Sequence, residues 1–142
     1  MSTEDNKATT RRFFEEVWNQ GKLTVVDEFC APSFIYHTPT GPIHGLEGFK
    51  QFATMYRTAF PDLHIPMEDM IAEADKVVTR WTARGTHKGD LMGIPPTGKQ
   101  VTVTGILIGR FEGGKFVEGW IEFDALGMMQ QLGVVPAPGQ VS

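Results

Sequence analysis

The sequence predicts an α+β fold in which N-terminal helices cover one face of a curved antiparallel sheet. Two observations lead to this prediction. Before Pro61, apolar residues recur at helical spacing. After Pro61, the pattern changes to long consecutive strand-like segments separated by turn residues. Helices followed by a run of strands are typical of the α+β class. If the sheet is strongly curved it forms a cone, and its concave face is the expected pocket.

Three helical segments are expected in the first part of the chain. The first covers about residues 5–19 and ends at Gly21. Its apolar stripe consists of Phe13, Phe14, Val17 and Trp18. A short second helix is expected over Leu23–Phe29, and a third over Leu46–Phe60, where Pro61 ends it. Between the last two, Phe34–His37 has the composition of a short strand.

The second part of the chain is expected to form a sheet. Its strands are predicted over His64–Ala74, Val77–His87, Gln100–Phe111 and Lys115–Asp124. Gly113-Gly114 is a strong hairpin signal between the last two, and Gly89–Lys99 is a Gly/Pro-rich loop. A short helix over Ala125–Leu132 is predicted to end at Gly133. We therefore expect a single domain over residues 1–135 and a flexible tail over 136–142.

Composition narrows the function classes. The 142 residues are 41% apolar and 21% charged, with a formal net charge of −4, as in a globular domain. No basic cluster is longer than Arg11-Arg12, so neither a nucleic acid nor a membrane surface is an expected partner. Cys30 is the only cysteine, which excludes an intrachain disulfide. The chain has no apolar run of membrane-spanning length and no signal-peptide pattern, so a cytoplasmic protein is expected.

The segment Lys115–Asp124 has an unusual pattern. Under strict strand alternation, one face carries Phe116, Glu118, Trp120, Glu122 and Asp124. The opposite face carries Val117, Ile121 and Phe123. Carboxylates beside large aromatic rings suit a wet cavity lined by aromatics, although alternation alone is equally compatible with a solvent-facing strand. If the first face lines the pocket, the second lies on the convex side and needs a cover, which predicts a homodimer.

Asp124 and Glu122 are the leading acid–base candidates. A carboxylate that loses hydration in an aromatic pocket becomes a stronger proton acceptor. Glu118, nearest the hairpin turn, is expected at the surface. His87 stands where a strand meets the Gly/Pro-rich loop, and two roles are open to it. It is either an acid–base or donor group at the cavity mouth, or a structural partner of the loop backbone.

Further residues are candidates for the wall that contacts substrate: Trp18, Tyr36, His37, Arg80, Phe116 and Trp120. Tyr36 and His37 lie on opposite faces of their strand, so only one points inward. Arg80 shares a face with Thr82, whereas Trp81 shares the other with His87. Alternation does not decide which of these faces is concave, and a surface arginine is the alternative for Arg80.

Several common site motifs are missing from the sequence. It contains no GxGxxG or P-loop phosphate cradle and no GxSxG nucleophile elbow. The histidines at 37, 44, 64 and 87 show no HxH or HxxxH metal spacing. The expected chemistry therefore needs neither a metal nor a nucleotide cofactor.

A set of short motifs carries a family resemblance. They are VWNQG at 17–21, HTP at 37–39, FPDL at 60–63, GTHKG at 85–89, GIPPTGK at 93–99, Trp120 with DALG at 124–127, and QQLG at 130–133. Together they span about residues 10–134. This combination resembles the SnoaL-like polyketide cyclase (ester cyclase) family, within the nuclear-transport-factor-two-like superfamily of α+β cones.

The resemblance implies a cofactor-independent, lyase- or isomerase-type enzyme that closes a ring by intramolecular aldol chemistry on an apolar carbonyl substrate, and a homodimer. Asp124 matches the family's Trp-x-x-x-Asp pattern and His87 its GTHxG histidine, which implies an acid–base and a polarising or positioning donor. Two alternatives stay open. One is a non-catalytic binder of hydrophobic small molecules. The other is an epoxide-hydrolase- or hydroxylase-like enzyme that activates water through Glu122 or Asp124. An arginine–carboxylate version of that site is disfavoured because Thr82 stands two residues after Arg80.

Overall fold

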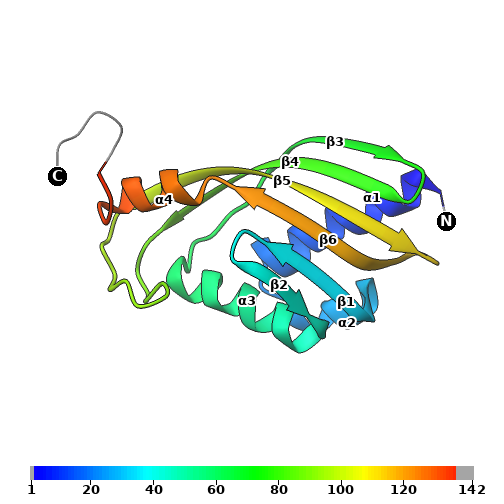
Figure 1. The fold of residues 1–142 in the computed structure, drawn as a ribbon, viewed down its shortest axis with the longest axis horizontal. Coiled ribbons are helices and arrows are strands. Elements are labelled where there is room, and N and C mark those ends of the chain that lie inside the picture. Colours follow the sequence, from blue (N-terminus) through cyan, green and yellow to red (C-terminus); the bar gives the residue numbers. More distant parts are fainter. Residues whose placement is uncertain (1, 137–142) are drawn as a thin grey trace.

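A computed structural model of the protein describes residues 2–136. Its centre is a six-stranded sheet with strand order β2-β1-β6-β5-β4-β3 (Figure 1). The strands are β1 Cys30–Thr38, β2 Gly41–His44, β3 Met67–Glu73, β4 Lys76–Thr86, β5 Gln100–Glu112 and β6 Lys115–Phe123. The helices are α1 Thr3–Arg12, α2 Val26–Phe29, α3 Gly45–Ala59 and α4 Ala125–Leu132, with a π-helical segment Phe13–Asn19 after α1 and a 3₁₀ turn Leu23–Val25 before α2. These elements confirm the predicted α+β class.

The sheet is curved, and the helices pack against its concave face (Figure 1). α1 contacts β3 and β4, whereas α3 contacts β1 and β2. The sheet is open, with β2 and β3 at its edges. All neighbouring strands are antiparallel except β1 and β6, which run parallel. The fold is therefore an open cone, and the space between helices and sheet is where a pocket can form.

The N-terminal helix agrees with the sequence prediction. Ser2 caps α1, since its hydroxyl accepts from the backbone N–H of Asp5 while the Asp5 carboxylate accepts from the N–H of Ser2. The chain continues without a break into the π-helical segment. The predicted apolar stripe, Phe13, Phe14, Val17 and Trp18, is buried there. The aromatic rings of this segment thus pack into the core between the helices and the sheet.

Strand β2 was not predicted from the sequence. β1 is longer than the predicted Phe34–His37, and it pairs with β2, where Pro39, Gly41 and Pro42 had suggested only irregular chain. Pro42 is accommodated because β2 is an edge strand, where a missing backbone N–H costs little. The predicted tail, 136–142, lies outside the described residues except for Pro136.

The hairpin between β5 and β6 determines which side chains face inward. Glu112 pairs with Lys115, and both turn glycines have positive φ, 56° and 80°, as a two-residue hairpin requires. Phe111 then pairs with Phe116 but Arg110 with Glu118. One residue, Val117, is therefore an extra bulge residue that reverses the alternation.

The bulge contradicts the prediction that Phe116, Glu118, Trp120 and Glu122 share a face. Phe116 points inward and packs against Phe13, Phe34 and Phe111. From Glu118 onward the even-numbered side chains lie on the convex face, and the odd-numbered Ile121 and Phe123 lie on the concave face. A single bulge thus exchanges the two faces for most of the strand.

Candidate active site

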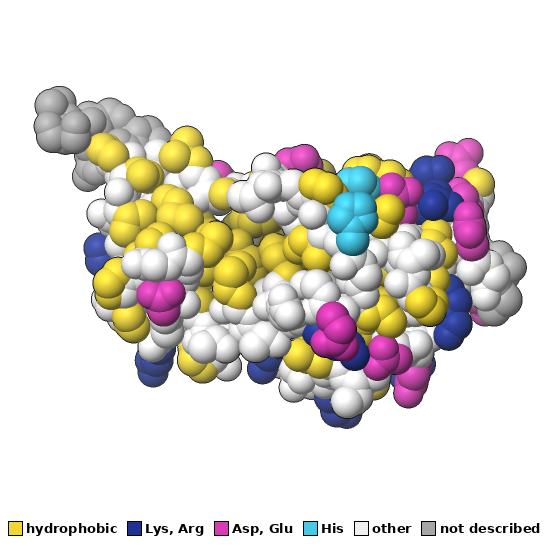
Figure 2. Space-filling view, turned by 60° about the horizontal axis from the view of Figure 1, so that its bottom comes forward, with side chains coloured by type: hydrophobic (Ala, Val, Ile, Leu, Met, Phe, Trp, Pro, Cys, Tyr) yellow, Lys and Arg dark blue, Asp and Glu magenta, His cyan; other side chains and the backbone are white. Residues whose placement is uncertain are grey.

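A pocket lies between the helices and the concave face of the sheet. It encloses about 610 Å³ of empty space, its open mouth included. Its lining residues are Phe14, Trp18, Tyr36, Phe52, Tyr56, Phe60, Leu63, Ile65, Trp81, Ala83, Arg84, Gly85, Val101, Val103, Ile121, Phe123 and Met128. Figure 2 shows hydrophobic side chains gathered on the half of this face that carries α4. The lining contains no carboxylate, and a site of this kind suits an apolar ligand.

Trp18 and Tyr36, two of the six predicted wall residues, line this pocket. Tyr36 points inward from β1 and is completely buried, so His37 lies on the other face. On β4, the face with Trp81 is the concave one. Trp81, Tyr56, Phe60, Ile121 and Phe123 belong to the wall but were not among the candidates. Tyr56 had a usable signal, because it lies in the helix predicted over Leu46–Phe60 one turn after Phe52, which also lines the pocket.

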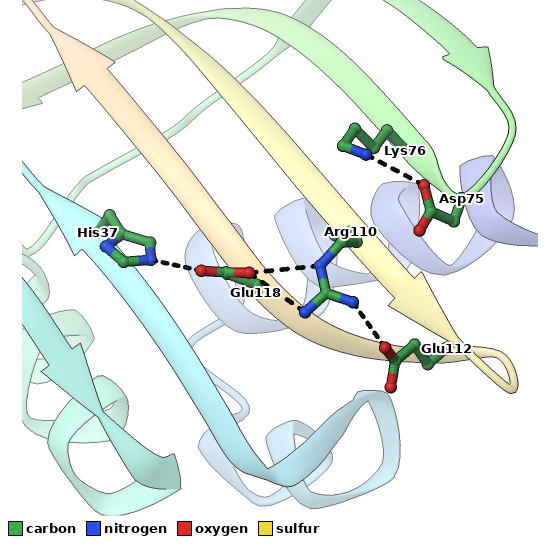
Figure 3. Close-up of polar contacts among 6 residues, drawn as sticks. All are labelled: His37, Asp75, Lys76, Arg110, Glu112 and Glu118. Carbon is green, nitrogen blue, oxygen red and sulfur yellow. Dashed lines mark hydrogen bonds and ion pairs between the residues drawn. The ribbon is translucent and has the colours of Figure 1, made fainter.

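Trp120 and His37 lie on the convex face and stack on each other, with ring centroids 5.3 Å apart and an angle of 11° between the planes. Glu118 Oε2 lies 2.7 Å from His37 Nε2, and Arg110 Nη2 donates to Glu118 Oε1 at 3.2 Å (Figure 3). The hydrogen bond with His37, aided by Arg110, lowers the pKa of Glu118. The prediction that Trp120 is a wall of the pocket was therefore wrong.

Three other candidates also lie away from the pocket. Glu122 and Arg80 are exposed on the convex face, where both pair with Ile106 of β5. Phe116 is fully buried but lies in the core, beyond the pocket lining. Glu122 and Phe116 therefore do not line the substrate cavity as predicted, the first because of the bulge. For Arg80, which alternation left open between the cavity and the surface, the structure shows the surface position, because β4 presents its odd face inward.

Asp124 lies at the edge of the pocket. It immediately follows Phe123, and Met128 is one helical turn further on; both line the pocket. Asp124 is exposed and caps α4, because its Oδ1 accepts from the N–H of Gly127 at 2.9 Å. A Cβ at position 127 would lie 2.1 Å from Asp124 Oδ2, so a larger residue there would displace the capping carboxylate. The cap fixes the direction of the carboxylate.

His87 is fully buried and holds the loop between β4 and β5. Its backbone exchanges hydrogen bonds with Lys99 and Gly98, and its Nδ1 accepts from the N–H of Thr97 at 3.2 Å. This bond places the ring proton on Nε2, an assignment that follows from the hydrogen-bond pattern. The ring packs on Phe60, at 5.5 Å between centroids, and so supports the pocket wall from behind.

Other groups are less suited to acid–base or nucleophilic work. Burial raises the pKa of Cys30 to about 12, which keeps its thiol protonated at neutral pH. Burial also raises the pKa of Tyr36 and of Tyr56, so both phenols keep their protons.

Within residues 2–136, no three His, Cys, Asp or Glu side chains are grouped to hold a metal ion. None of the helices described has the length and apolar character needed to span a membrane.

The family model of the SnoaL-like polyketide cyclases matches residues 8–132. None of the curated proteins matches the chain.

Several solved structures share the fold over most of their length. A proposed SnoaL-like polyketide cyclase from Jannaschia sp. CCS1 is 26% identical, with a TM-score of 0.88 over 94% of this chain and 95% of that chain. AclR, a proposed hydroxylase from Streptomyces galilaeus, is 27% identical, with a TM-score of 0.87 over 98% of this chain and 87% of that chain. A proposed polyketide cyclase from Acidithiobacillus ferrooxidans is 34% identical, with a TM-score of 0.80 over 94% of this chain and 99% of that chain. The family match over residues 8–132, on a cone of this shape, places the protein in the SnoaL-like polyketide cyclase family.

Proposed function

We propose that the protein is a cofactor-independent cyclase that closes a ring in an apolar carbonyl compound by an intramolecular aldol reaction. The observation that carries this proposal is an apolar, aromatic-walled pocket together with Asp124, which directly follows the lining residue Phe123 and whose carboxylate is held as the cap of α4. Family membership supports the cyclase class. The substrate class follows from the lining, which is mainly hydrophobic and aromatic and suits a largely uncharged compound.

In this proposal Asp124 is the acid–base group. Its carboxylate takes a proton from a carbon next to one carbonyl, and the resulting electron pair attacks the carbon of a second carbonyl. A carbon–carbon bond forms, the second oxygen becomes an alkoxide, and Asp124 returns the proton to it. An apolar substrate that covers the pocket mouth removes water from Asp124, which strengthens the carboxylate as a proton acceptor.

The hydrogen bonds among residues 2–136 leave one carboxylate oxygen available for this role. Oδ1 is engaged by Gly127, whereas Oδ2 accepts no hydrogen bond from the described part of the chain. Anchoring one oxygen while the other stays available gives the base a fixed direction. For His87 we propose a positioning role, because its ring supports Phe60 and its Nδ1 holds Thr97. The catalytic roles of Asp124 and His87 stay predictions.

The test compares Asp124→Asn with Glu122→Gln, a matched control two residues away on the convex face. Aromatic β-keto esters that carry a second ketone within reach of the acidic carbon serve as probes, and chromatography with mass spectrometry follows ring closure, which leaves the mass unchanged. We expect Asp124→Asn to bind the probes like wild type and to lose at least about a hundredfold in rate. Glu122→Gln should keep the wild-type rate. An unchanged rate in Asp124→Asn would contradict the proposal.

A second candidate, a non-catalytic binder of apolar small molecules, is favoured by one observation: no carboxylate lines the pocket itself. The same experiment separates the candidates. A binder returns every probe unaltered in mass and retention time. A water-activating enzyme yields a product that gains one water and carries labelled solvent oxygen. Because Glu122 lies on the convex face, Asp124 is the carboxylate left for that chemistry.

A further inference from the structure

The QQLG motif at residues 130–133 links the last helix to the sheet through one side chain. The carboxamide of Gln131 makes two hydrogen bonds with the backbone of Thr102 on β5. Its Oε1 accepts from the Thr102 N–H at 2.7 Å, and its Nε2 donates to the Thr102 carbonyl at 2.9 Å. Leu132 is buried, and Gly133, with a φ of 83°, ends the helix. Gln131 is therefore the residue of the motif that joins α4 to β5.

Thr102 lies where β5 no longer has β6 beside it. β6 ends at Phe123, and the next N–H along the chain, that of Asp124, donates to the carbonyl of Thr104 at 3.1 Å. In an antiparallel sheet, alternate residues of a strand direct their N–H and C=O groups to the same neighbour. The backbone groups of Thr102 therefore point to the side that β6 has left. The Gln131 carboxamide occupies the place that the next β6 residue would take.

The two ends of α4 are thus both bonded to β5, the first through the backbone of Asp124 and the last through Gln131. A helix of eight residues has little stability of its own, so its position depends on such bonds and on the packing of its buried residues, Met128 and Leu132. The first turn of the same helix supplies the Gly127 N–H that holds Asp124 Oδ1. A helix that is released at its last turn would therefore hold this carboxylate less firmly.

We propose that Gln131 is a positioning residue, which holds α4 against β5 and thereby keeps the Asp124 carboxylate in its capping direction. The effect on turnover rests on the proposed function, because a carboxylate that takes a proton from carbon needs a fixed direction. The effect on the cap is a property of the free protein and is measured without substrate.

Hydrogen exchange followed by NMR tests the effect on the cap, with Gln131→Met compared to Gln130→Met. Methionine has a similar length and helix propensity but cannot donate to the Thr102 carbonyl. Gln130 is the matched control, because its hydrogen bond to Gly133 comes from its backbone carbonyl. In Gln131→Met the amides of Gly127 and Met128 should exchange at least about fivefold faster than in wild type.

Two controls show that this loss is local. In Gln130→Met the same two amides should exchange within about twofold of the wild-type rate. The amides of the β4–β5 ladder, which report opening of the whole sheet, should keep their wild-type rates in both variants.

The ring-closure assay supplies the second measurement. Gln131→Met should lower kcat about tenfold and keep KM within about threefold of wild type, because the apolar pocket wall keeps its residues. Gln130→Met should change neither constant. An equal fall of kcat in both variants would overturn the inference, as would an unchanged kcat in Gln131→Met despite faster exchange.

The two measurements separate this inference from the proposed function. If exchange responds as expected but the wild type closes no ring, the role of Gln131 in the cap stands and the proposed function is contradicted. If ring closure requires Asp124 but neither exchange nor kcat responds to Gln131→Met, the proposed function stands and the positioning role is overturned.

Discussion

The two faces of β6 differ in almost every property although they alternate along one short strand. The concave face presents Ile121 and Phe123 to the pocket. The convex face presents Glu118, Trp120 and Glu122, with the first two joined to His37 by a hydrogen bond and a ring stack. Ile121 and Phe123 form part of the pocket wall, whereas Glu118, Trp120 and Glu122 form part of the outer surface of the sheet. The bulge at Val117, rather than composition, therefore decides which face of β6 lines the pocket.

The bulge itself gives the prediction with the largest expected effect. Deleting Val117 leaves Phe116 inward and Glu118 outward, because the bulge residue is the extra one. Deleting Trp120 instead shifts the rest of the strand by one residue and turns Glu122 toward the apolar pocket. We expect the Val117 deletion to cost about 1–2 kcal/mol and the Trp120 deletion more than about 3 kcal/mol of unfolding free energy.

Urea unfolding followed by circular dichroism measures both deletions. Glu122→Gln, a conservative change on the exposed face, should stay within about 0.5 kcal/mol of wild type and serves as the control. Equal losses in the two deletion variants would show that the faces are not set by the bulge.

The elements of this fold could be read from the sequence more reliably than their faces. Helix Ala125–Leu132 and the Gly113-Gly114 hairpin are where apolar periodicity and turn glycines predict them. The face of β6 could not be predicted, because a bulge is a pairing of two residues against one and leaves no mark in the pattern of one strand. Tyr36 and Trp18 were identified as wall residues, whereas Trp81 was missed because the orientation of β4 depends on its neighbours.

The residues found on the convex face also change the surface at which a second copy of the chain is expected to bind. The expected surface, Val117, Ile121 and Phe123, is wrong, because the last two line the pocket. A different apolar row crosses the outer face: Trp120, Ile108, Val78 and Ile71 are consecutive register partners from β6 to β3. Ile71 and Ile106 are 62% and 46% exposed. We keep the homodimer as a proposal and assign it to this face.

Charge supports a second copy as the occupant. Glu122 on β6 and Arg80 on β4 flank Ile106 of β5 and are both exposed. With a two-fold axis along β5, Glu122 of one copy faces Arg80 of the other. Light scattering at micromolar concentration should then give twice the chain mass. Arg80→Glu should weaken the dimer at least about tenfold, and the double variant Arg80→Glu with Glu122→Arg should restore it.

Controls keep this prediction specific to the convex face. Ile106→Glu should give a monomer with an unchanged circular dichroism spectrum, whereas Phe52→Leu, on the pocket side, should stay dimeric. A monomeric wild type, or no recovery in the charge-exchanged variant, would argue against a dimer through this surface.

The smallest expected effect concerns Glu118 and pH. Hydrogen bonds from His37 and Arg110 lower its pKa in the folded state below the value of about 4.3 expected for an unfolded chain. Glu118 therefore contributes stability that is fully present above this unfolded value and is lost as pH falls through the lowered folded pKa. The difference in unfolding free energy between wild type and Glu118→Gln should shrink as pH falls from about 5 toward 3. Urea titrations at each pH measure it, with the pocket variant Tyr56→Phe as a pH-independent control. If the difference in unfolding free energy does not shrink below pH 5, His37 and Arg110 do not lower the pKa of Glu118 in the folded protein.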